Sequence, residues 1–464
     1  MQSKVLKQNM TTGKLLPQMI AFTLPVLFTG ILQLLYNAAD LAVVGRWADD
    51  YALAAVGSTG ALINLIVNLF IGLSVGANVL IARYVGEKNE EGISRAVHTS
   101  IFISIVFGVF VGIFGIVMAK TLLVWMNSPE EVIDLSSLYV RIYFGGMPFT
   151  MLYNFGAAIL RGMGDTRRPL IALATSGILN VGLNMILVIG FGRSVDGVAI
   201  ATVVSQAYAC SMVLFFLRKE KGAVHLSFKK LRIHKTELWF MARIGLPAGI
   251  QGSLFSISNV LIQSGINSFG PIAVSGNSAA ANLEGFVYTS MNAVYQATLT
   301  FVGQNCGAGR WDRVKNVLFI AFGIVTVVGV VMGGGCFLLG KYLLRFYTDT
   351  PETIAYGLVR LRYICLLYVC CGWMEVLVGQ MRGMGYSFVP MIVSFIGVCG
   401  FRIFWIFTVF RQSHTLPTLY ISYPISWAIT ILIYVVILLV LWNKVIKKKM
   451  ISPPAKEELS AENA

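Results

Sequence analysis

Runs of about 20 apolar residues recur along the whole chain, and they restrict its fold more than any other feature of the sequence. A run of this length crosses the ~30 Å hydrocarbon layer of a membrane as a helix. Of the 464 residues 56% are hydrophobic and 12% are charged, so a single water-soluble core cannot bury the apolar side chains. The alternating pattern of a membrane barrel is absent, and only helices satisfy a lipid-facing backbone here.

The sequence therefore predicts an all-α membrane protein with about twelve transmembrane helices. The predicted spans are residues 16–40, 54–82, 97–119, 136–160, 169–190, 197–217, 238–267, 273–302, 316–340, 356–380, 389–410 and 419–442. Lys4, Lys7 and Lys14 precede the first span, but no short apolar run ends in a cleavage-site pattern, so we expect no removable signal peptide.

The net charge of +15 is distributed as membrane topology requires. Of the 36 Lys and Arg residues, 26 lie in the termini and in alternate loops. The positive-inside rule then predicts a multi-pass protein of the inner (cytoplasmic) membrane with both termini in the cytoplasm. We expect the basic tail to contact anionic membrane lipid, and we expect no nucleic-acid partner.

An internal repeat divides the chain into two halves. The sequence Arg-Gly-Met-Gly at residues 161–164, followed by Pro169, recurs at 382–385, followed by Pro390. An even number of helices per half predicts two pseudo-symmetric six-helix lobes, related by an axis along the membrane normal and facing a central cleft. The predicted domains are an N-terminal lobe (1–217), a basic cytoplasmic linker (218–237), a C-terminal lobe (238–445) and a cytoplasmic tail (446–464).

The polar residues inside predicted spans are the candidates for function, because a carboxylate at mid-membrane costs at least about 2.5 kcal/mol. Asp40 lies late in the first span. Asn180 and Asn184 lie one helical turn apart, and Thr202 and Tyr139 can converge at the same depth. These five residues form a candidate cation-coupling pocket. Two alternatives remain open: Asp40 lies in interfacial water at its helix end, or the two asparagines join helices.

A second polar group follows spans 238–267 and 273–302. Glu284 is expected to attract a cation, and the tyrosine and methionine offer adaptable contacts. Helix packing through polar side chains is the alternative. For Glu375, near the end of span 356–380, we expect a structural or gating role, with Arg382 offsetting its charge. The candidate substrate-cleft residues are Gln251, Asn259, Gln263, Glu284, Tyr288, Met291 and Asn292.

Several motifs together resemble the multidrug and toxic compound extrusion (MATE) transporters along almost the whole length. They are Pro25 with Tyr36-Asn37-x-x-Asp40, Arg161-Gly162-x-Gly164-Asp165-Thr166 with Pro169, Asn180, Ala201-Thr202, and Val302-Gly303-Gln304-Asn305-x-Gly307-Ala308-Gly309. Within that family the chain is similar to the DNA-damage-inducible branch, because its acid lies in the first span and Gln251 replaces a glutamate early in the seventh.

The resemblance implies antiport driven by a proton or sodium gradient, with Asp40, Asn180 and Thr202 in the coupling pocket and Tyr139 as a weaker candidate. Some members of this branch have a second aspartate where this chain has Asn184. A single carboxylate favours the proton. A sodium site at Asp40 and Asn180 is the alternative, because a hard cation accepts carboxylate and amide oxygens.

The sequence thus predicts a secondary active antiporter that exports amphipathic, often cationic, small molecules by alternating access. A flippase for lipid-linked oligosaccharides, from a related superfamily, and a passive pore are the alternatives. The seven cysteines show no zinc-ligand spacing and the four histidines form no His-Glu-x-x-His motif. We therefore expect no enzyme, no resident metal and no cofactor. No oligomer is implied.

Overall fold

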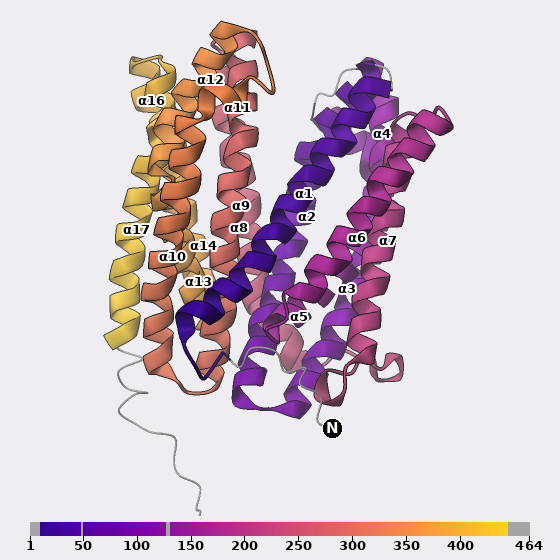
Figure 1. Ribbon diagram of the computed structural model, residues 1–464, viewed down its shortest axis with the longest axis vertical. Coiled ribbons are helices and arrows are strands. Elements are labelled where there is room, and N and C mark those ends of the chain that lie inside the picture. Colours follow the sequence, from indigo (N-terminus) through magenta and orange to yellow (C-terminus); the bar gives the residue numbers. More distant parts are fainter. Residues whose placement is uncertain (1–9, 48–49, 127–129, 444–464) are drawn as a thin grey trace, which may run out of the picture.

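The computed structural model describes residues 10–47, 50–126 and 130–443, and these residues are almost entirely helical. The expected tail at 446–464 lies outside them. The α-helices, several of them joined end to end, run through the length of the molecule (Figure 1). They are α1 (Leu15–Trp47), α2 (Asp50–Glu87), α3 (Glu90–Trp125), α4 (Glu130–Gly145), α5 (Met147–Gly162), α6 (Arg167–Asn184), α7 (Val195–Lys219), α8 (Lys235–Asn267), α9 (Pro271–Gly307), α10 (Trp311–Leu338), α11 (Gly340–Leu344), α12 (Pro351–Ile364), α13 (Tyr368–Gly383), α14 (Phe388–Ser394), α15 (Phe401–Trp405), α16 (Leu416–Tyr420) and α17 (Ser422–Leu441).

Most helices extend beyond the predicted apolar spans. For example, α8 begins at Lys235, inside the segment 218–237 that was expected to be a linker. Hydropathy detects only the apolar part of a helix, whereas polar turns at its ends continue the same backbone hydrogen bonds. Within the described residues, nine helices are long and apolar enough to cross a membrane by length and composition. The long helices α8 and α9 fall outside this group, and they carry the polar residues predicted to line a cleft.

The helices form two groups that lie close together at one end of the molecule and diverge toward the other (Figure 1). We call α2–α7, with the part of α1 after Gly30, the N-terminal bundle, and α8–α17 the C-terminal bundle. Three segments are π-helical. Met185–Gly190 directly follows α6, and Phe395–Gly400 and Ile406–Phe410 lie on either side of α15. Such segments are frequent at functional sites.

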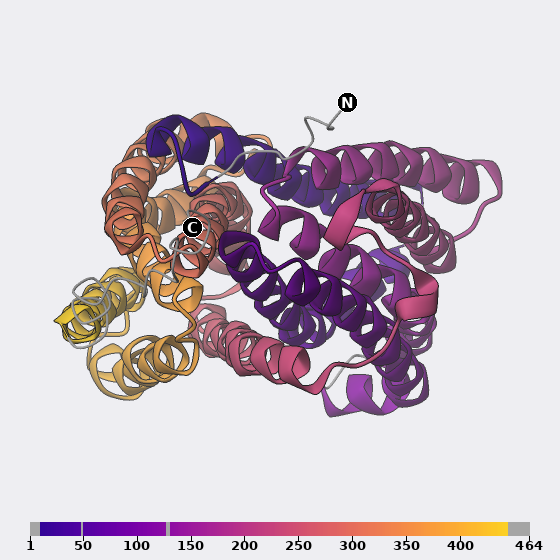
Figure 2. The same ribbon diagram turned by 90° about the horizontal axis from the view of Figure 1, so that it is seen from below.

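Helices α1 and α8 each begin against the opposite bundle. Phe22 of α1 packs edge-on against Phe301 of α9, with ring centroids 5.8 Å apart. Met241 of α8 accepts a hydrogen bond from Ser100 of α3. Figure 2 shows α1 (indigo) reaching across both groups of helices. The two packing groups therefore do not coincide with the two halves of the sequence. The first helix of each half, α1 or α8, begins against the helices of the other half.

Glycines allow the two bundles to meet closely along α2 and α8. A side chain at Gly72 would lie within 2.1 Å of the backbone of Gly249, and one at Gly245 within 2.6 Å of the backbone of Leu73. A Cβ atom does not fit at these distances, so only glycine permits this approach. The contact lies in the second half of α2 and the first half of α8.

We call the end where the two bundles lie close together the closed end. Hydrogen bonds and an ion pair join the bundles there. Gln304 donates to the carbonyl oxygen of Gly162 at 2.9 Å, and Arg95 pairs with Glu237 at 2.9 Å. Arg313 donates to the carbonyl oxygens of Met10, Thr12 and Gly13, in the segment that leads into α1. The closed end thus carries several of the Lys and Arg residues of the alternate loops, whose distribution predicted the membrane topology.

Candidate functional site

A buried carboxylate lies where α1, α6 and α7 meet. Asp40 is 9% exposed. The Asn184 amide donates to its Oδ1 at 2.5 Å. The Thr202 hydroxyl lies 3.3 Å from its Oδ2 and 3.0 Å from the Val198 carbonyl oxygen, so its one proton is shared between these two acceptors. The Asn184 amide also lies 3.2 Å from the Asn180 Oδ1 that accepts from it. Four of the five residues predicted for the coupling pocket therefore lie together, and Asp40 does not lie in bulk solvent.

A close contact between α1 and α6 positions this carboxylate. Tyr36, one turn before Asp40, lies across Gly177 of α6, where a Cβ would come within 1.6 Å of the Tyr36 ring. The Tyr36 hydroxyl is 3.1 Å from the carbonyl oxygen of Leu173, to which it donates. Since Gly177 precedes both asparagines on α6, its missing side chain sets the distance between the carboxylate and the amides.

Tyr139 of α4 occupies the wall behind the carboxylate. Its ring stacks on that of Tyr143 at a centroid distance of 6.2 Å, and it is 7% exposed. Both phenol groups lie within electrostatic range of Asp40. Within the part of the chain that the structure describes, Tyr139 makes no direct hydrogen bond to Asp40, so it lies next to the pocket and not among the groups that hold the carboxylate.

The partners of Asp40 are uncharged. In the described part of the chain, the groups that contact its carboxylate are the amides and the hydroxyl already named, with no Lys, Arg or His among them. The Asn184 Oδ1 is buried and accepts no hydrogen bond. A buried carboxylate without a base costs free energy when ionised, and this cost falls when it binds a proton or a cation. The arrangement is suited to reversible ion binding.

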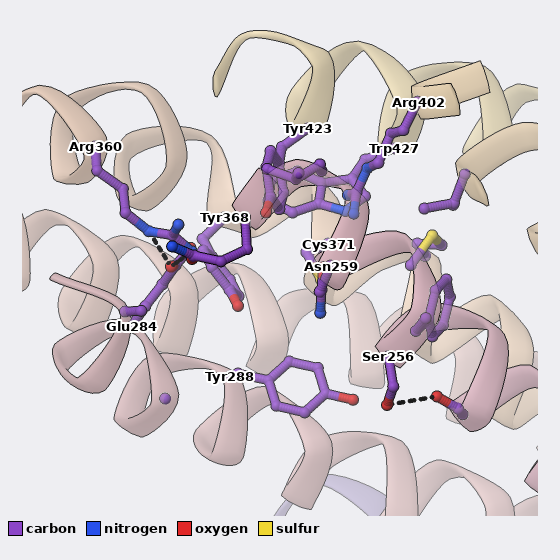
Figure 3. A pocket seen from close by; sticks show the side chains of 18 of the residues that line it. Ser256, Asn259, Glu284, Tyr288, Arg360, Tyr368, Cys371, Arg402, Tyr423 and Trp427 are labelled. Carbon is purple, nitrogen blue, oxygen red and sulfur yellow. Dashed lines mark hydrogen bonds and ion pairs between the residues drawn. The ribbon is translucent and has the colours of Figure 1, made fainter. Parts of the chain in front are cut away.

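A cavity of about 530 Å³ lies in the C-terminal bundle, on the side that faces α2. Its wall comes from α8, α9, α12, α13, α15 and α17, with Val398 of the segment Phe395–Gly400 and Asn68 of α2 (Figure 3). A volume in this range accommodates a drug-sized molecule. The Tyr288 ring, which is 39% exposed, projects into the space between the charged groups of the wall.

The structure separates the seven residues predicted for a substrate cleft. Asn259, Gln263, Glu284 and Tyr288 line the cavity. Gln251 does not line it, because its amide bonds to Ser394 and Arg382 in the packed interior.

Met291 and Asn292 also lie outside the cavity wall. Met291 is fully buried, and its side chain fills the space left by Gly329 and Gly372. Asn292 lies one turn beyond Tyr288 and interacts with its phenol. The polar residues on this face of α9 therefore have two different surroundings: some line the cavity, and others pack between helices. The neighbouring helices decide which residue does which.

The negative charge of Glu284 is neutralised by an arginine that was not among the predicted cleft residues. Arg360 of α12 donates to its carboxylate from Nε at 2.9 Å and from Nη2 at 2.5 Å. Arg360 also donates to Asn277 at 2.6 Å. The expectation that Glu284 attracts a cation needs correction, because its negative charge is already paired.

Two further charged side chains line the cavity, although they were not among the residues predicted for the substrate cleft. Glu375 lines the cavity and is 6% exposed. Arg382 lies within electrostatic range of it, as expected, and donates its hydrogen bonds to Tyr295 and Gln251. The structural or gating role of Glu375 stays a prediction. Arg402 of α15 also lines the cavity. The sequence held a signal for the two arginines of the wall, Arg360 and Arg402. Both lie inside predicted apolar spans, where a charge is costly.

The long apolar helices, the two bundles and the polar pockets inside them define the class of a polytopic membrane transporter. The MatE family profile matches the chain twice, at residues 25–186 and 247–408. These two segments cover more than half of the sequence, and the chain belongs to the MatE family of transporters. It is a transporter and not an enzyme.

Curated relatives match along most of the chain. "Probable multidrug resistance protein YoeA" of Bacillus subtilis (strain 168) is 28% identical over 96% of this chain and 97% of its own length. "Multidrug export protein MepA" of Staphylococcus aureus (strain NCTC 8325 / PS 47) is 21% identical over 72% of this chain and 74% of its own length.

Solved structures share the fold. A MATE protein in the bent conformation has a TM-score of 0.86 at 21% identity, covering 93% of this chain and 96% of that one. An outward-facing multidrug resistance MATE transporter of the MOP superfamily also has a TM-score of 0.86, at 20% identity, covering 96% and 100%. A transporter from Pyrococcus furiosus, described as having a binding pocket of reverse polarity, has a TM-score of 0.85 at 20% identity, covering 96% and 100%. The prediction of an all-helical membrane fold is confirmed.

Proposed function

We propose that this protein is a secondary active antiporter that exports amphipathic, often cationic, small molecules in exchange for protons. The observation that carries the proposal is the buried Asp40 carboxylate, whose partners are uncharged amide and hydroxyl groups. The names of YoeA and MepA, which refer to multidrug resistance and multidrug export, support the export of drug-like compounds.

In the proposed cycle, Asp40 alternates between an ionised and a neutral form. Burial opposes the ionised form, whereas hydrogen bonds from Asn184 and Thr202 stabilise it. A proton entering from the outside neutralises the carboxylate and weakens its hold on these donors. Sodium is the alternative ion, since the carboxylate, the Asn180 oxygen and the unpartnered Asn184 oxygen are hard ligands.

Alternating access is supported by the contrast between the two ends of the molecule. The bundles lie close together at the end where α2 ends against the end of α9, and they diverge at the other (Figure 1). By the positive-inside rule, the closed end with its basic loops faces the cytoplasm of a cell whose inner membrane holds the protein. The two halves then act as lobes that rock about this contact, as expected of the DNA-damage-inducible branch.

A flippase for lipid-linked oligosaccharides is the second candidate, and the two arginines of the C-terminal cavity are the observation that favours it. Arg360 and Arg402 both line the wall, and a phosphate-linked substrate requires basic groups. The pairing of Arg360 with Glu284 leaves fewer free positive charges than such a role would require.

The test uses the purified protein in liposomes, with a cationic xanthene dye as the transported probe and proton and sodium gradients imposed separately. We expect uptake driven by the proton gradient and lost with a protonophore, and no uptake from the sodium gradient alone. Asp40→Asn should abolish gradient-driven transport under both conditions. Asp134→Asn, at an aspartate whose side chain is 84% exposed, is the matched control and should behave as the wild type.

The outcomes separate the candidates. Normal gradient-driven transport by Asp40→Asn would refute the assignment of Asp40 to coupling. Transport driven by sodium alone would make sodium the coupling ion. Dye equilibration without any gradient would indicate a passive pore, and movement of a lipid-linked oligosaccharide without dye transport would indicate the flippase.

A further inference from the structure

Two charged side chains of the cavity wall form no ion pair among the described residues, the carboxylate of Glu375 and the guanidinium of Arg402. Arg402 is 4% exposed and lines the cavity wall. Its Nε donates to the Ser426 hydroxyl at 3.1 Å. Its guanidinium carbon lies 4.0 Å from the centroid of the Tyr423 ring. In the part of the chain that the structure describes, no carboxylate lies within ion-pair distance of it, whereas the other arginine of the wall is paired with Glu284.

The free donors of Arg402 are its chemically informative part. A guanidinium has five N–H groups, and one of these is used on Ser426. Burying a charge without a counter-charge costs several kcal/mol, which the contact with the Tyr423 ring offsets only in part. An anion bound in the cavity would supply the missing counter-charge.

The surrounding backbone and side chains favour a defined orientation of this group. Arg402 lies in the short helix α15 between the π-helical segments Phe395–Gly400 and Ile406–Phe410. Figure 3 shows Arg402 beside Tyr423 and Trp427, away from the Arg360–Glu284 pair. Nε donates to Ser426, so the two terminal nitrogens of the guanidinium remain for a bidentate contact.

The internal repeat shows how the two bundles differ. The spacing that separates Pro25 from Pro247, and the two segments matched by the family profile, relates Asp40 to residue 262. Ile262 holds the position equivalent to Asp40 and is buried. The C-terminal site is therefore not a second copy of the carboxylate pocket.

We propose that Arg402 binds an anionic group of the transported molecule, so that the substrates include amphipathic compounds with a carboxylate or phosphate attached to an aromatic body. Tyr423, Trp427 and Tyr368 provide aromatic surface for that body. This inference rests on the proposed function as an exporter and adds a class of substrate that a cation-selective cleft would exclude.

The experiment compares two probes that differ in one charge: a xanthene dye with a free carboxylate, and its methyl ester. Equilibrium binding is measured on the purified protein in neutral detergent, and transport in phosphatidylcholine liposomes. Wild-type protein should bind the acid more tightly than the ester. Arg402→Gln should weaken binding of the acid about tenfold, or about 1.4 kcal/mol, and leave the ester within about twofold. Arg402→Lys should restore part of the loss, and Arg411→Gln, at an exposed arginine, is the matched control.

Equal binding of acid and ester by the wild type would overturn the proposal even if Arg402→Gln fails to fold. An equal loss of both probes in Arg402→Gln would also overturn it, because this is the result of a purely structural role. If phosphatidylglycerol inhibits binding of the acid in the wild type but not in Arg402→Gln, the group bound is a lipid headgroup, and the assignment to a transported molecule fails. Binding is measured without a gradient, so failure of coupled transport remains a separate result.

Discussion

The two bundles share a helical plan, yet their polar interiors differ in how charge is held. In the N-terminal bundle, Asp40 contacts uncharged donors. In the C-terminal bundle, Glu284 is bound by Arg360, Arg402 lies on an aromatic ring, and Glu375 lines the cavity without an ion pair among the described residues. A carboxylate among amides can change its charge by binding an ion, whereas a carboxylate paired with arginine retains it. Asp40 and Glu284 therefore differ: the first is suited to coupling, and the cavity that contains the second, with charges of both signs in its wall, is suited to recognition.

The largest expected difference between the bundles is in stability. Glu284→Gln removes the partner of a buried arginine, and we expect a loss of about 3–5 kcal/mol in the free energy of unfolding. Asp40→Asn leaves no charge unpaired, so its effect should stay below about 1 kcal/mol. Thermal unfolding of both variants in one detergent measures the contrast.

The double variant Glu284→Gln/Arg360→Gln provides the control for this prediction. It removes both charges and should recover part of the stability lost in the single variant. Equal destabilisation by Glu284→Gln and Asp40→Asn would contradict the view that the two carboxylates are held differently.

A smaller effect is expected where α1 meets α6. Gly177→Ala places a methyl group within 1.6 Å of the Tyr36 ring and must move the helices apart. We expect a loss of about 1–3 kcal/mol in stability and weaker coupling, because the shift moves Asp40 away from the amides.

Gly182→Ala is the matched control on the same helix, since a Cβ there has no neighbour within 4 Å. Unfolding midpoints and gradient-driven dye uptake are measured for both variants. If Gly177→Ala and Gly182→Ala behave alike, the contact with Tyr36 does not position the carboxylate.

The smallest effect concerns the hydroxyl of the carboxylate pocket. Thr202→Val removes a donor 3.3 Å from Asp40, and the lost hydrogen bond corresponds to about 0.5–1.5 kcal/mol. The concentration of the coupling ion that gives half-maximal transport should therefore change by about two- to tenfold. Thr408→Val, at a hydroxyl that bonds only to the Phe404 carbonyl oxygen, is the control. An unchanged ion dependence in Thr202→Val would remove Thr202 from the pocket.

Hydropathy and motifs were informative where local sequence decides the outcome. The apolar runs predicted the helical membrane fold, because a lipid-facing backbone has few alternatives. The residues Asp40, Asn180, Asn184 and Thr202 were also selected correctly as neighbours, since costly polar groups at one depth have few places to go. Their role in ion coupling stays a prediction.

The second polar group shows where such reasoning ends. Helical periodicity put Gln251 and Met291 on a face with Asn259 and Glu284, but a face has neighbours on more than one side. Gln251 meets Arg382, and Met291 fills the space beside two glycines. The helices that supply these neighbours lie far away in sequence, so the division into wall and packing residues could not be read from spacing.

By itself, the sequence determined the solvent, the helices, the repeat and the list of polar residues that lipid would exclude. Only the tertiary structure decided which of those residues meet: Asp40 with amides, Glu284 with Arg360, and Arg402 with Tyr423. The physical reason is that hydrophobicity acts on each segment separately, whereas the state of a buried charge depends on which groups the fold brings within a few ångströms of it.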